Sequence, residues 1–302
     1  MTLATAGAAT LKISVLTVNF NTESHIQQAL DSLRAQSLPA DQFEVILINN
    51  KQNDKLRQTI DPAQYPFAIH FVDSPENVGF GRANNLGAAQ ARGEYLLVMN
   101  PDITLEQPQY LQSLYDCAKA HPNYGALATP HLTDGKLRPS ANYEYEFSHN
   151  YTGKSGICWL SGAIMLIPRA VYSQVGGFDP DFFMYSEDVD IGLRIRAAGY
   201  DLFEMSSLYA THEGGSSEPY KDYAYFQRWY RSRFLFCHKH YPAAIYQEIL
   251  QDHLRDARRK QPLYRWGRHV LPRWKEKWNK WQAVVDCIQE REPQLLAQTS
   301  TS

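Results

Sequence analysis

Four apolar runs in the first hundred residues constrain the fold of this chain more than any other feature. They cover residues 11–20, 43–49, 67–72 and 94–100, and they are rich in β-branched and aromatic side chains. A helical pattern follows the first run, with Ile26, Leu30 and Leu33 on one face, and another helix is expected after Gly79 and Gly81. Strands that alternate with helices form a parallel, doubly wound sheet. We therefore predict an α/β fold with four buried, parallel strands in this region.

The sequence beyond residue 130 is less regular until it becomes helical. Residues 130–158 are polar and aromatic without a period, which predicts a long loop region over the ligand crevice. A buried strand is expected over 159–168, a loop and a helix over 176–200, and a strand ending near His212. After residue 217 the chain is helical and basic, and its polar tail is predicted to be disordered.

Polar side chains stand at the carboxyl ends of the expected parallel strands. These are Asn19, Asn49, Asp73 and Asp102. In doubly wound sheets, ligands bind in the crevice beyond these strand ends. The convergence favours a binding site at this edge, where Asp102 holds something charged. The alternative for Asp102 is that it caps the helix that follows.

Asp102 and His212 are candidate metal ligands, and residues 187–190 are a candidate source of a catalytic base. One carboxylate and one histidine form a small ligand set for a divalent cation, but a substrate diphosphate supplies further oxygen ligands. His212 has the alternative of being an ordinary histidine at a strand end. Three carboxylates close together raise one another's pKa, which suits one of them to accept a proton. Their alternative role is to cap a helix by favourable interaction with its dipole.

The segment NVGFGRANN, residues 77–85, indicates an anion site at a helix start. Gly79 and Gly81 allow a tight turn whose N–H groups, together with Arg82, are available to an anion. The segment does not have the G-x-G-x-x-G pattern, and it follows the third strand rather than the first. Binding of NAD or FAD is therefore not expected.

Cysteine usage and hydropathy indicate the compartment. Cys117, Cys158, Cys237 and Cys287 lie far apart without a C-x-x-C pair, so neither a zinc cluster nor a disulfide framework is predicted. The first residues lack the apolar core of a signal peptide, and no later run approaches the about 18 apolar residues of a spanning helix. We expect a cytoplasmic protein in a reducing compartment.

Basic residues and tryptophans are concentrated in residues 255–281. This stretch holds ten lysines and arginines but two acidic residues, and four of the six tryptophans, although the whole chain has a net charge of −2. On a helix begun near Pro272, one apolar stripe is formed by Val270, Leu271, Trp274, Trp278, Trp281 and Val285. The stripe either packs on the rest of the chain or on a second subunit, or it binds an anionic membrane at its cytoplasmic face. An amphipathic face suits a membrane better than nucleic acid.

Six motifs, in this order, resemble those of inverting glycosyltransferase family 2, and specifically of its bacterial rhamnosyltransferase-like members. They are VNFN, NVGFGRANN, MNPD, WLSGAIMLIPR, GGFDPDFFMYSEDVDIGLR and HEGGSS, and they lie between residue 12 and about residue 217. The resemblance implies the nucleotide-diphospho-sugar transferase fold, called GT-A. The expected domains are then a GT-A catalytic domain over 1–217, with 1–10 disordered, and a helical, basic, tryptophan-rich C-terminal extension over 218–302.

The resemblance also implies roles for single residues. Asp188 corresponds to the catalytic base, with Glu187 as the fallback, and Asp102 to the last acid of the D-x-D metal motif, with Mg²⁺ or Mn²⁺ as the cofactor. His212 completes the metal site. The expected nucleotide contacts are Asn19, Asn49, Asn77, Gly79, Arg82, Asn85 and Asp102, and the expected acceptor walls are Trp159, Gly162 and the loop over 140–156.

Two positions depart from the family pattern. Asn100 replaces the first acid of the D-x-D motif, which weakens the metal site by one charge. Asn49 replaces the aspartate that contacts the base, and an amide offers both a donor and an acceptor. The sequence therefore leaves the identity of the nucleobase open.

The predicted function is transfer of a sugar, such as rhamnose, from a nucleoside diphosphate sugar to a saccharide or lipid-linked saccharide in cell-surface polysaccharide synthesis, for example of O-antigen. A sugar nucleotidyltransferase of the same fold would need a glycine-rich, basic loop after the first strand, and NFNTES has neither glycine nor lysine. A non-catalytic sugar-binding or scaffold protein would be free to lose Asp102, Asp188 or His212, and all three are present. Binding to nucleic acid is not expected, and the oligomeric state stays open.

Overall fold

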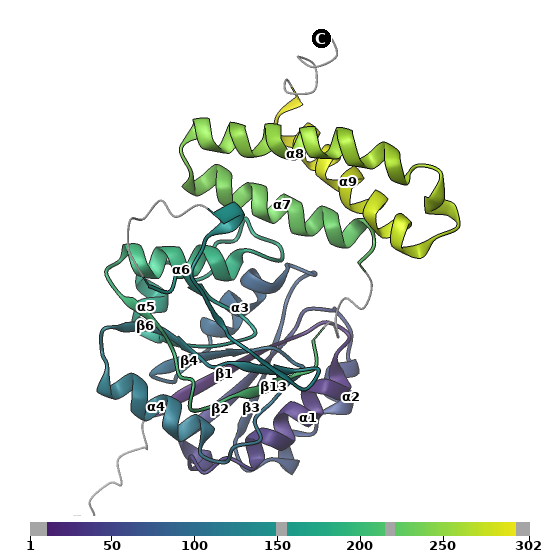
Figure 1. The fold of residues 1–302 in the computed structure, drawn as a ribbon. Coiled ribbons are helices and arrows are strands. Elements are labelled where there is room, and N and C mark those ends of the chain that lie inside the picture. The colour runs from purple at the N-terminus through teal and green to yellow at the C-terminus, as the bar shows by residue number, and fades with distance from the viewer. Residues whose placement is uncertain (1–10, 149–155, 215–220, 294–302) are drawn as a thin grey trace, which may run out of the picture. The chain divides into compact units, whose positions relative to one another are not determined.

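The computed structural model describes residues 11–148, 156–214 and 221–293, which form two compact units (Figure 1). The first, here called the sheet unit, comprises Met1–Tyr145, Lys154–Pro180 and Asp188–Ser217. The second, the helical unit, comprises Glu146–Gly153, Asp181–Glu187 and Glu218–Ser302. The helical unit thus includes two segments from within the range expected for the catalytic domain. The disorder expected for 1–10 and for the polar tail concerns residues outside the described ones.

The main sheet of the described residues has the strand order β12-β6-β11-β4-β1-β2-β3, and all neighbours are parallel except β11. Its strands are β1 (Ile13–Asn19), β2 (Phe43–Asn49), β3 (Ala68–Asp73), β4 (Tyr95–Met99), β6 (Tyr124–Ala128), β11 (Ile164–Pro168) and β12 (Asp201–Glu204). Strands β1, β2 and β4 are buried along their whole length, as expected for parallel strands covered on both faces. The predicted burial of 67–72 is wrong, because β3 is an edge strand and is half-exposed.

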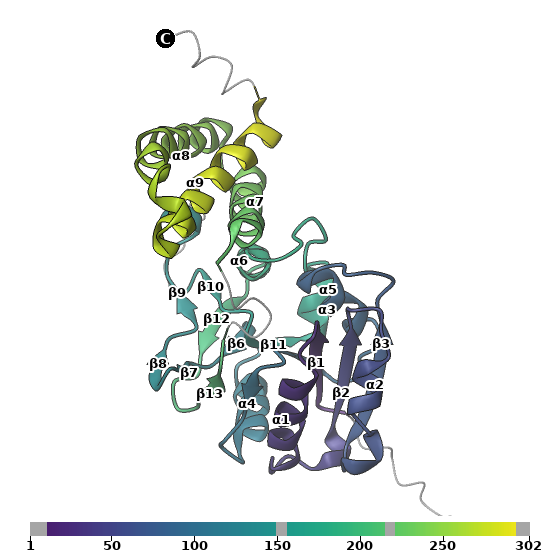
Figure 2. The same ribbon diagram turned by 90° about the vertical axis from the view of Figure 1, so that its right-hand side faces the viewer.

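Helices cover both faces of this sheet (Figure 2). One face packs against α1 (Glu23–Arg34), α2 (Lys55–Thr59) and α4 (Tyr110–Ala120), and the other against α3 (Phe80–Ala88), α5 (Arg169–Gln174) and α6 (Glu187–Ala197). The first core contains Leu30, Leu33 and Leu114, and the second contains Ala83, Tyr172 and Ile195. The α/β prediction with a mostly parallel, doubly wound sheet is therefore confirmed.

The long loop predicted over residues 130–158 is wrong in part. Within it lie β7 (His131–Thr133), β8 (Lys136–Arg138) and β9 (Ala141–Asn142). Together with β5 (Ile103–Thr104) and β13 (Ala210–His212), β7 and β8 form a second sheet of order β5-β13-β7-β8. Strands of two or three residues are too short to show an alternating pattern in the sequence.

Two runs predicted as single strands each form two. The run over 159–168 divides into β10 (Trp159–Leu160), which pairs with β9, and β11 of the main sheet. The run that ends near His212 divides into β12 and β13, which belong to different sheets. A turn at Ser161–Ala163 separates β10 from β11 and sets Gly162 beside α6.

The helical unit contains α7 (Tyr223–His240), α8 (Ala243–Tyr264) and α9 (Pro272–Arg291), with α9 packed against both other helices. Helix α9 begins at Pro272, where the sequence predicted a start, because proline suits the first position of a helix. Its buried side chains are Trp281, Ala283, Val284, Cys287 and Ile288. None of the helices in the described part of the chain has the length and apolar character that crossing a bilayer would require. The four cysteines are free thiols.

Candidate active site

Strand register aligns the polar residues at the carboxyl edge of the main sheet. Asn19 of β1 is directly opposite Asn49 of β2, which is opposite Asp73 of β3. Asn19 and Asn49 are buried, whereas Asp73 is half-exposed and forms a bidentate ion pair with Arg57, at 2.7 Å for both contacts. Strand pairing therefore brings these three side chains into one row.

Within the described residues, the amide oxygen of Asn49 is an unused hydrogen-bond acceptor at this edge of the sheet. The Nδ2 of Asn49 donates to the carbonyl oxygen of Asn53 at 2.7 Å and to Asp73 at 3.1 Å. Its Oδ1 is buried and has no hydrogen-bond partner in the described structure. A buried acceptor without a partner is rare in folded proteins, because its desolvation is not compensated. Asn49 thus offers an acceptor to an N–H group of a ligand.

Asn50 holds the glycine turn in place, and the sequence analysis missed it. Its Nδ2 donates to Asn77 Oδ1 at 3.0 Å, and its Oδ1 accepts from the N–H of Val78 at 3.1 Å and from Ser74 Oγ at 2.8 Å. Asn77 Oδ1 also accepts from the N–H of Gly79, which has φ 84° and precedes α3. The signal in the sequence was the Asn-Asn pair after the second strand.

Three of the expected nucleotide contacts form hydrogen bonds within the sheet unit, Asn19 to its own loop and Arg82 and Asn85 to the segment 172–180. Asn19 Oδ1 accepts from the N–H and hydroxyl of Thr22, both at 3.1 Å. Asn85 Oδ1 accepts from the Tyr172 hydroxyl and from the N–H of Phe178, and its Nδ2 donates to the Phe178 carbonyl oxygen. The exposed Arg82 donates through Nε to the carbonyl oxygen of Pro180. The amide oxygen of Asn85 already accepts two hydrogen bonds, and one N–H of its Nδ2 donates a third. A contact between a nucleotide and the other N–H of Asn85 stays a prediction.

Asp102 and His212 lie together, here called the Asp102–His212 pair. The second sheet places His212 of β13 opposite Ile103 of β5, and His212 Nε2 is 3.4 Å from Asp102 Oδ1. Asp102 is buried, and His212 is mostly buried. The strand β5, rather than a helix, follows Asp102, so the helix-cap alternative is wrong.

His131 is a second histidine beside this pair that the sequence analysis missed. It begins β7, next to β13, and its ring packs edge-to-face on the His212 ring at a centroid distance of 5.7 Å. Both of its ring nitrogens are buried without a hydrogen-bond partner in the described structure. Burial, and secondarily the nearby His212, lower the pKa of His131 to about 4. The imidazole is therefore neutral near pH 7 and adds no charge to the Asp102–His212 pair.

Asp188 stands in the first turn of α6, which the chain enters through two strained residues. Tyr185 and Ser186 have φ values of 72° and 62°, which are unusual for residues other than glycine. Asp188 Oδ2 accepts from the N–H of Gly162 at 3.0 Å, and its Oδ1 accepts from the N–H of Val189 at 2.9 Å. These bonds fix the direction of the carboxylate.

The pKa of Asp188 is raised, mainly because burial disfavours the charged form, while the N–H groups of Gly162 and Val189 oppose the shift. The sequence analysis expected repulsion among three carboxylates as the cause. Asp190 is instead paired with Arg194, whose Nε and Nη2 donate to it at 2.8 and 2.5 Å. This pair is buried on the Asp190 side.

The expected acceptor walls lie partly within the described residues. Trp159 is half-buried and donates through Nε1 to the carbonyl oxygen of Glu144 at 2.9 Å. A Cβ on Gly162 would lie 3.2 Å from Asp188 Cβ, so the absence of a side chain there allows the close approach of this turn to the carboxylate. Of the loop over 140–156, residues 149–155 lie outside the described ones.

Comparisons with known proteins show the family and the fold of this chain. The model of the family described as glycosyl transferase family 2 matches residues 14–192. The chain is 27% identical over 262 residues to the N-acetylglucosaminyl-diphospho-decaprenol L-rhamnosyltransferase of Mycobacterium tuberculosis, covering 74% of this chain and 83% of that protein. It is 25% identical over 225 residues to the rhamnosyltransferase WbbL of Escherichia coli, covering 66% and 83%.

A solved structure shows the same fold. The mannosyltransferase PcManGT of Pyrobaculum calidifontis, in complex with GDP-Man and Mn²⁺, aligns with 91% of this chain and 85% of its own. The TM-score is 0.57 and the sequence identity is 16%. The prediction of a GT-A fold is therefore confirmed.

Proposed function

Since this chain belongs to glycosyl transferase family 2, we propose that it transfers a sugar from a nucleoside diphosphate sugar to a hydroxyl group of a saccharide acceptor, with inversion at the anomeric carbon. The observation that carries the proposal is the partly buried carboxylate of Asp188, whose pKa is raised and which is fixed by the N–H groups of Gly162 and Val189. A carboxylate whose pKa is raised by burial is suited to remove a proton at neutral pH.

The proposed reaction is a single displacement. The acceptor hydroxyl oxygen attacks the anomeric carbon while its proton passes to Asp188, and the bond from that carbon to the diphosphate oxygen breaks with its electron pair. Attack opposite the leaving group inverts the configuration. Glu187, the preceding residue, is the alternative base, and its role is likewise a proposal.

The donor nucleotide is proposed to lie along the row of strand ends. Asn49 Oδ1, buried without a partner, accepts from an N–H of the nucleobase in this proposal. Asn77 and Gly79 line the turn before α3, where backbone N–H groups favour phosphate. Asn19, Arg82 and Asn85 are kept as proposed contacts, through the groups that their hydrogen bonds within the sheet unit leave available.

The residues present fit a divalent cation shared with the donor. The Asp102–His212 pair provides one carboxylate and one imidazole, and the neutral His131 beside it adds no positive charge that would repel a cation. In the described part of the chain, no group of three acidic, histidine or cysteine side chains is placed to hold a metal ion alone. Mg²⁺ or Mn²⁺ bound by Asp102, His212 and the donor would stabilise the negative charge of the departing diphosphate. The structure of PcManGT holds Mn²⁺ together with its donor.

The names of the relatives suggest the substrates. The relative from Mycobacterium tuberculosis is an L-rhamnosyltransferase named for a diphospho-decaprenol acceptor, and WbbL is also a rhamnosyltransferase. We propose rhamnose as the transferred sugar and a lipid-linked saccharide as the acceptor, in the synthesis of a cell-surface polysaccharide.

Turnover of one donor in a panel tests the proposed function. Purified protein with Mg²⁺, a lipid-linked saccharide and a set of nucleoside diphosphate sugars is expected to release nucleoside diphosphate with a rhamnose donor. Product stereochemistry by NMR should show inversion. Binding of every donor without turnover would favour the scaffold alternative, and production of a nucleotide sugar from a sugar phosphate would favour the nucleotidyltransferase.

The helical unit has an exposed apolar patch that suits a membrane surface. Leu263, Trp266, Val270, Leu271 and Trp274, here called the apolar patch, have exposed fractions from 38% to 84%. The stripe predicted along α9 therefore divides: Trp281 is buried in the unit, whereas Val270, Leu271 and Trp274 are exposed. The exposed basic side chains of Arg265, Arg273 and Lys275 lie in the same part of the chain. We propose that this patch binds anionic lipid, placing the enzyme at the cytoplasmic face of the membrane.

Vesicle binding tests this proposal. The double variant Trp266→Ser and Val270→Ser is expected to co-sediment about tenfold less with anionic vesicles than the unaltered chain, because both side chains are exposed and neither supports the core. Higher salt should weaken the binding. Leu137→Ser, which removes an exposed apolar side chain from the sheet unit, is the matched control and should bind as before. Equal binding by all three proteins would contradict the membrane role.

A further inference from the structure

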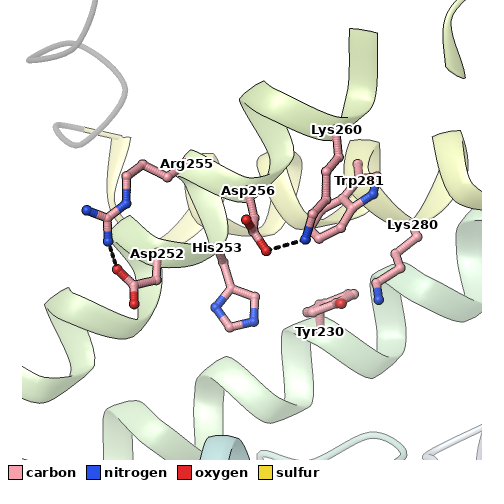
Figure 3. A pocket seen from close by; sticks show the side chains of 8 residues that line it. All are labelled: Tyr230, Asp252, His253, Arg255, Asp256, Lys260, Lys280 and Trp281. Atoms are coloured by element: carbon pink, nitrogen blue, oxygen red, sulfur yellow. Dashed lines mark hydrogen bonds and ion pairs between the residues drawn. The ribbon is translucent and has the colours of Figure 1, made fainter. Parts of the chain in front are cut away.

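A cavity of about 450 Å³ lies among the three long helices of the helical unit, and the proposed transfer reaction does not use it (Figure 3). Tyr230 comes from α7, His253 and Lys260 from α8, and Lys280 and Trp281 from α9. Its volume lies in the range of about 300 to 1,000 Å³ that is typical of small-molecule sites. The lining combines aromatic rings with several cations.

Both acidic side chains of the lining are paired. Asp256 Oδ2 accepts from Lys260 Nζ at 2.5 Å, and Asp252 forms an ion pair with Arg255 (Figure 3). Lys280 is different, because no carboxylate of the described residues lies within ion-pair distance of it. The cavity therefore holds one cation in excess.

The surroundings of Lys280 disfavour its charge. The side chain is half-buried, and the pKa of Lys280 is lowered by burial first, and then by the positive charges of Lys260 and Arg233, while the charge of Asp256 opposes the shift. Removing a charge from water without a partner is costly. An anion in the cavity would offset this cost.

Both lysines of the lining lie close to the same aromatic ring, that of Trp281. Lys260 Nζ and Lys280 Nζ lie 4.8 and 5.1 Å from the centroid of the Trp281 ring, having come from different helices. An ammonium group is a compact cation with three donors, which suits phosphate oxygens. A phosphate group presents several acceptor oxygens and more than one negative charge, so it can accept from both lysines, whereas a carboxylate offers less charge to share.

We propose that this cavity binds the phosphate group of an anionic ligand, with Lys280 and Lys260 as its contacts and Trp281 as its wall. The phosphate can belong to a lipid headgroup or to a soluble phosphate compound, since both present the same oxygens. The site is formed within the helical unit from residues that the transfer reaction does not involve, so it is independent of the proposed function.

Calorimetric titration of the full chain with inorganic diphosphate tests the proposal. EDTA is present throughout, so that diphosphate does not bind through a divalent cation at the Asp102–His212 pair. Lys280→Gln is expected to weaken binding about tenfold or more, the effect of losing a hydrogen bond between charged groups. Lys280→Arg should retain most of the affinity. Lys136→Gln is the matched control, because it removes the same charge from an exposed position of β8 in the sheet unit.

A second titration identifies the source of the phosphate. Vesicles that contain phosphatidic acid are compared with vesicles of phosphatidylcholine alone. If Lys280→Gln weakens binding to the phosphatidic acid vesicles as well, the site accepts a lipid headgroup; if it weakens diphosphate binding alone, the ligand is soluble. Melting temperatures check that each variant is folded. The proposal is overturned if Lys280→Gln leaves both probes unchanged, or if Lys136→Gln weakens binding as much as Lys280→Gln does.

Discussion

Asp188→Asn is expected to lower the rate of sugar transfer by about 10² to 10⁴ while leaving donor binding nearly unchanged. Asparagine keeps the shape of the side chain and one oxygen acceptor, but it cannot accept the proton of the acceptor hydroxyl. One of the two N–H groups that now bind the carboxylate, from Gly162 and Val189, would lose its acceptor. Removal of a charge that the partial burial of Asp188 disfavours offsets that loss, so the melting temperature should change little.

The dependence of the rate on pH checks the same assignment. The raised pKa of Asp188 places the acidic limb of the rate profile at higher pH than an ordinary aspartate would, because the base must be ionised to act. The raised pKa of Asp188 affects the stability of the folded chain in the opposite direction to the rate. An acid with a raised pKa in the fold destabilises the folded chain as pH rises from its unfolded pKa to its folded one, and Asp188→Asn should remove this dependence.

Glu187→Gln is the comparison for the base assignment. It removes the neighbouring carboxylate and should leave most of the transfer rate. Single-turnover assays with saturating donor separate the rate from binding. If Glu187→Gln abolishes transfer and Asp188→Asn does not, then Glu187 is the base.

Asp102→Ala and His212→Ala are expected to weaken binding of nucleoside diphosphate about tenfold or more when Mg²⁺ or Mn²⁺ is present. The protein and the diphosphate share the ion. Loss of either protein ligand therefore weakens the binding of the ion and of the diphosphate. Because Asn100 stands where the family motif has an acid, Asp102 and His212 each contribute a larger part of the protein's affinity for the ion. Calorimetry with and without EDTA measures the effect.

His121→Ala is the control for the metal prediction, because it removes an exposed histidine of the sheet unit that follows α4. It should bind nucleoside diphosphate as the unaltered chain does. If neither EDTA nor the loss of Asp102 and His212 changes the binding of nucleoside diphosphate, the Asp102–His212 pair has a structural role only.

Much of the fold could be predicted from the sequence, because its signals are local. The strand predicted over 43–49 agrees with β2 at both ends, since a buried parallel strand is a continuous apolar run with polar residues on either side. The start of α9 at Pro272 was also predicted, from the conformation that proline imposes. The ordered motifs indicated the family, and the family model that matches 14–192 confirms it. The site residues taken from the resemblance stay predictions.

The tertiary structure decided which segments are neighbours. The exposure of β3 follows from its place at the sheet edge. Of the short strands within 130–158, β7 pairs with β13 and β8 with β7, while β9 pairs with β10, and these partners except β7 lie beyond residue 158. His131 acquires its low pKa from burial beside His212, about eighty residues away in the chain. Sequence alone thus determined the longer buried strands, the start of α9 and the chemistry available at the strand ends. Only folding determined burial, pairing and the excess charge of Lys280, because these depend on contacts between residues far apart in the sequence.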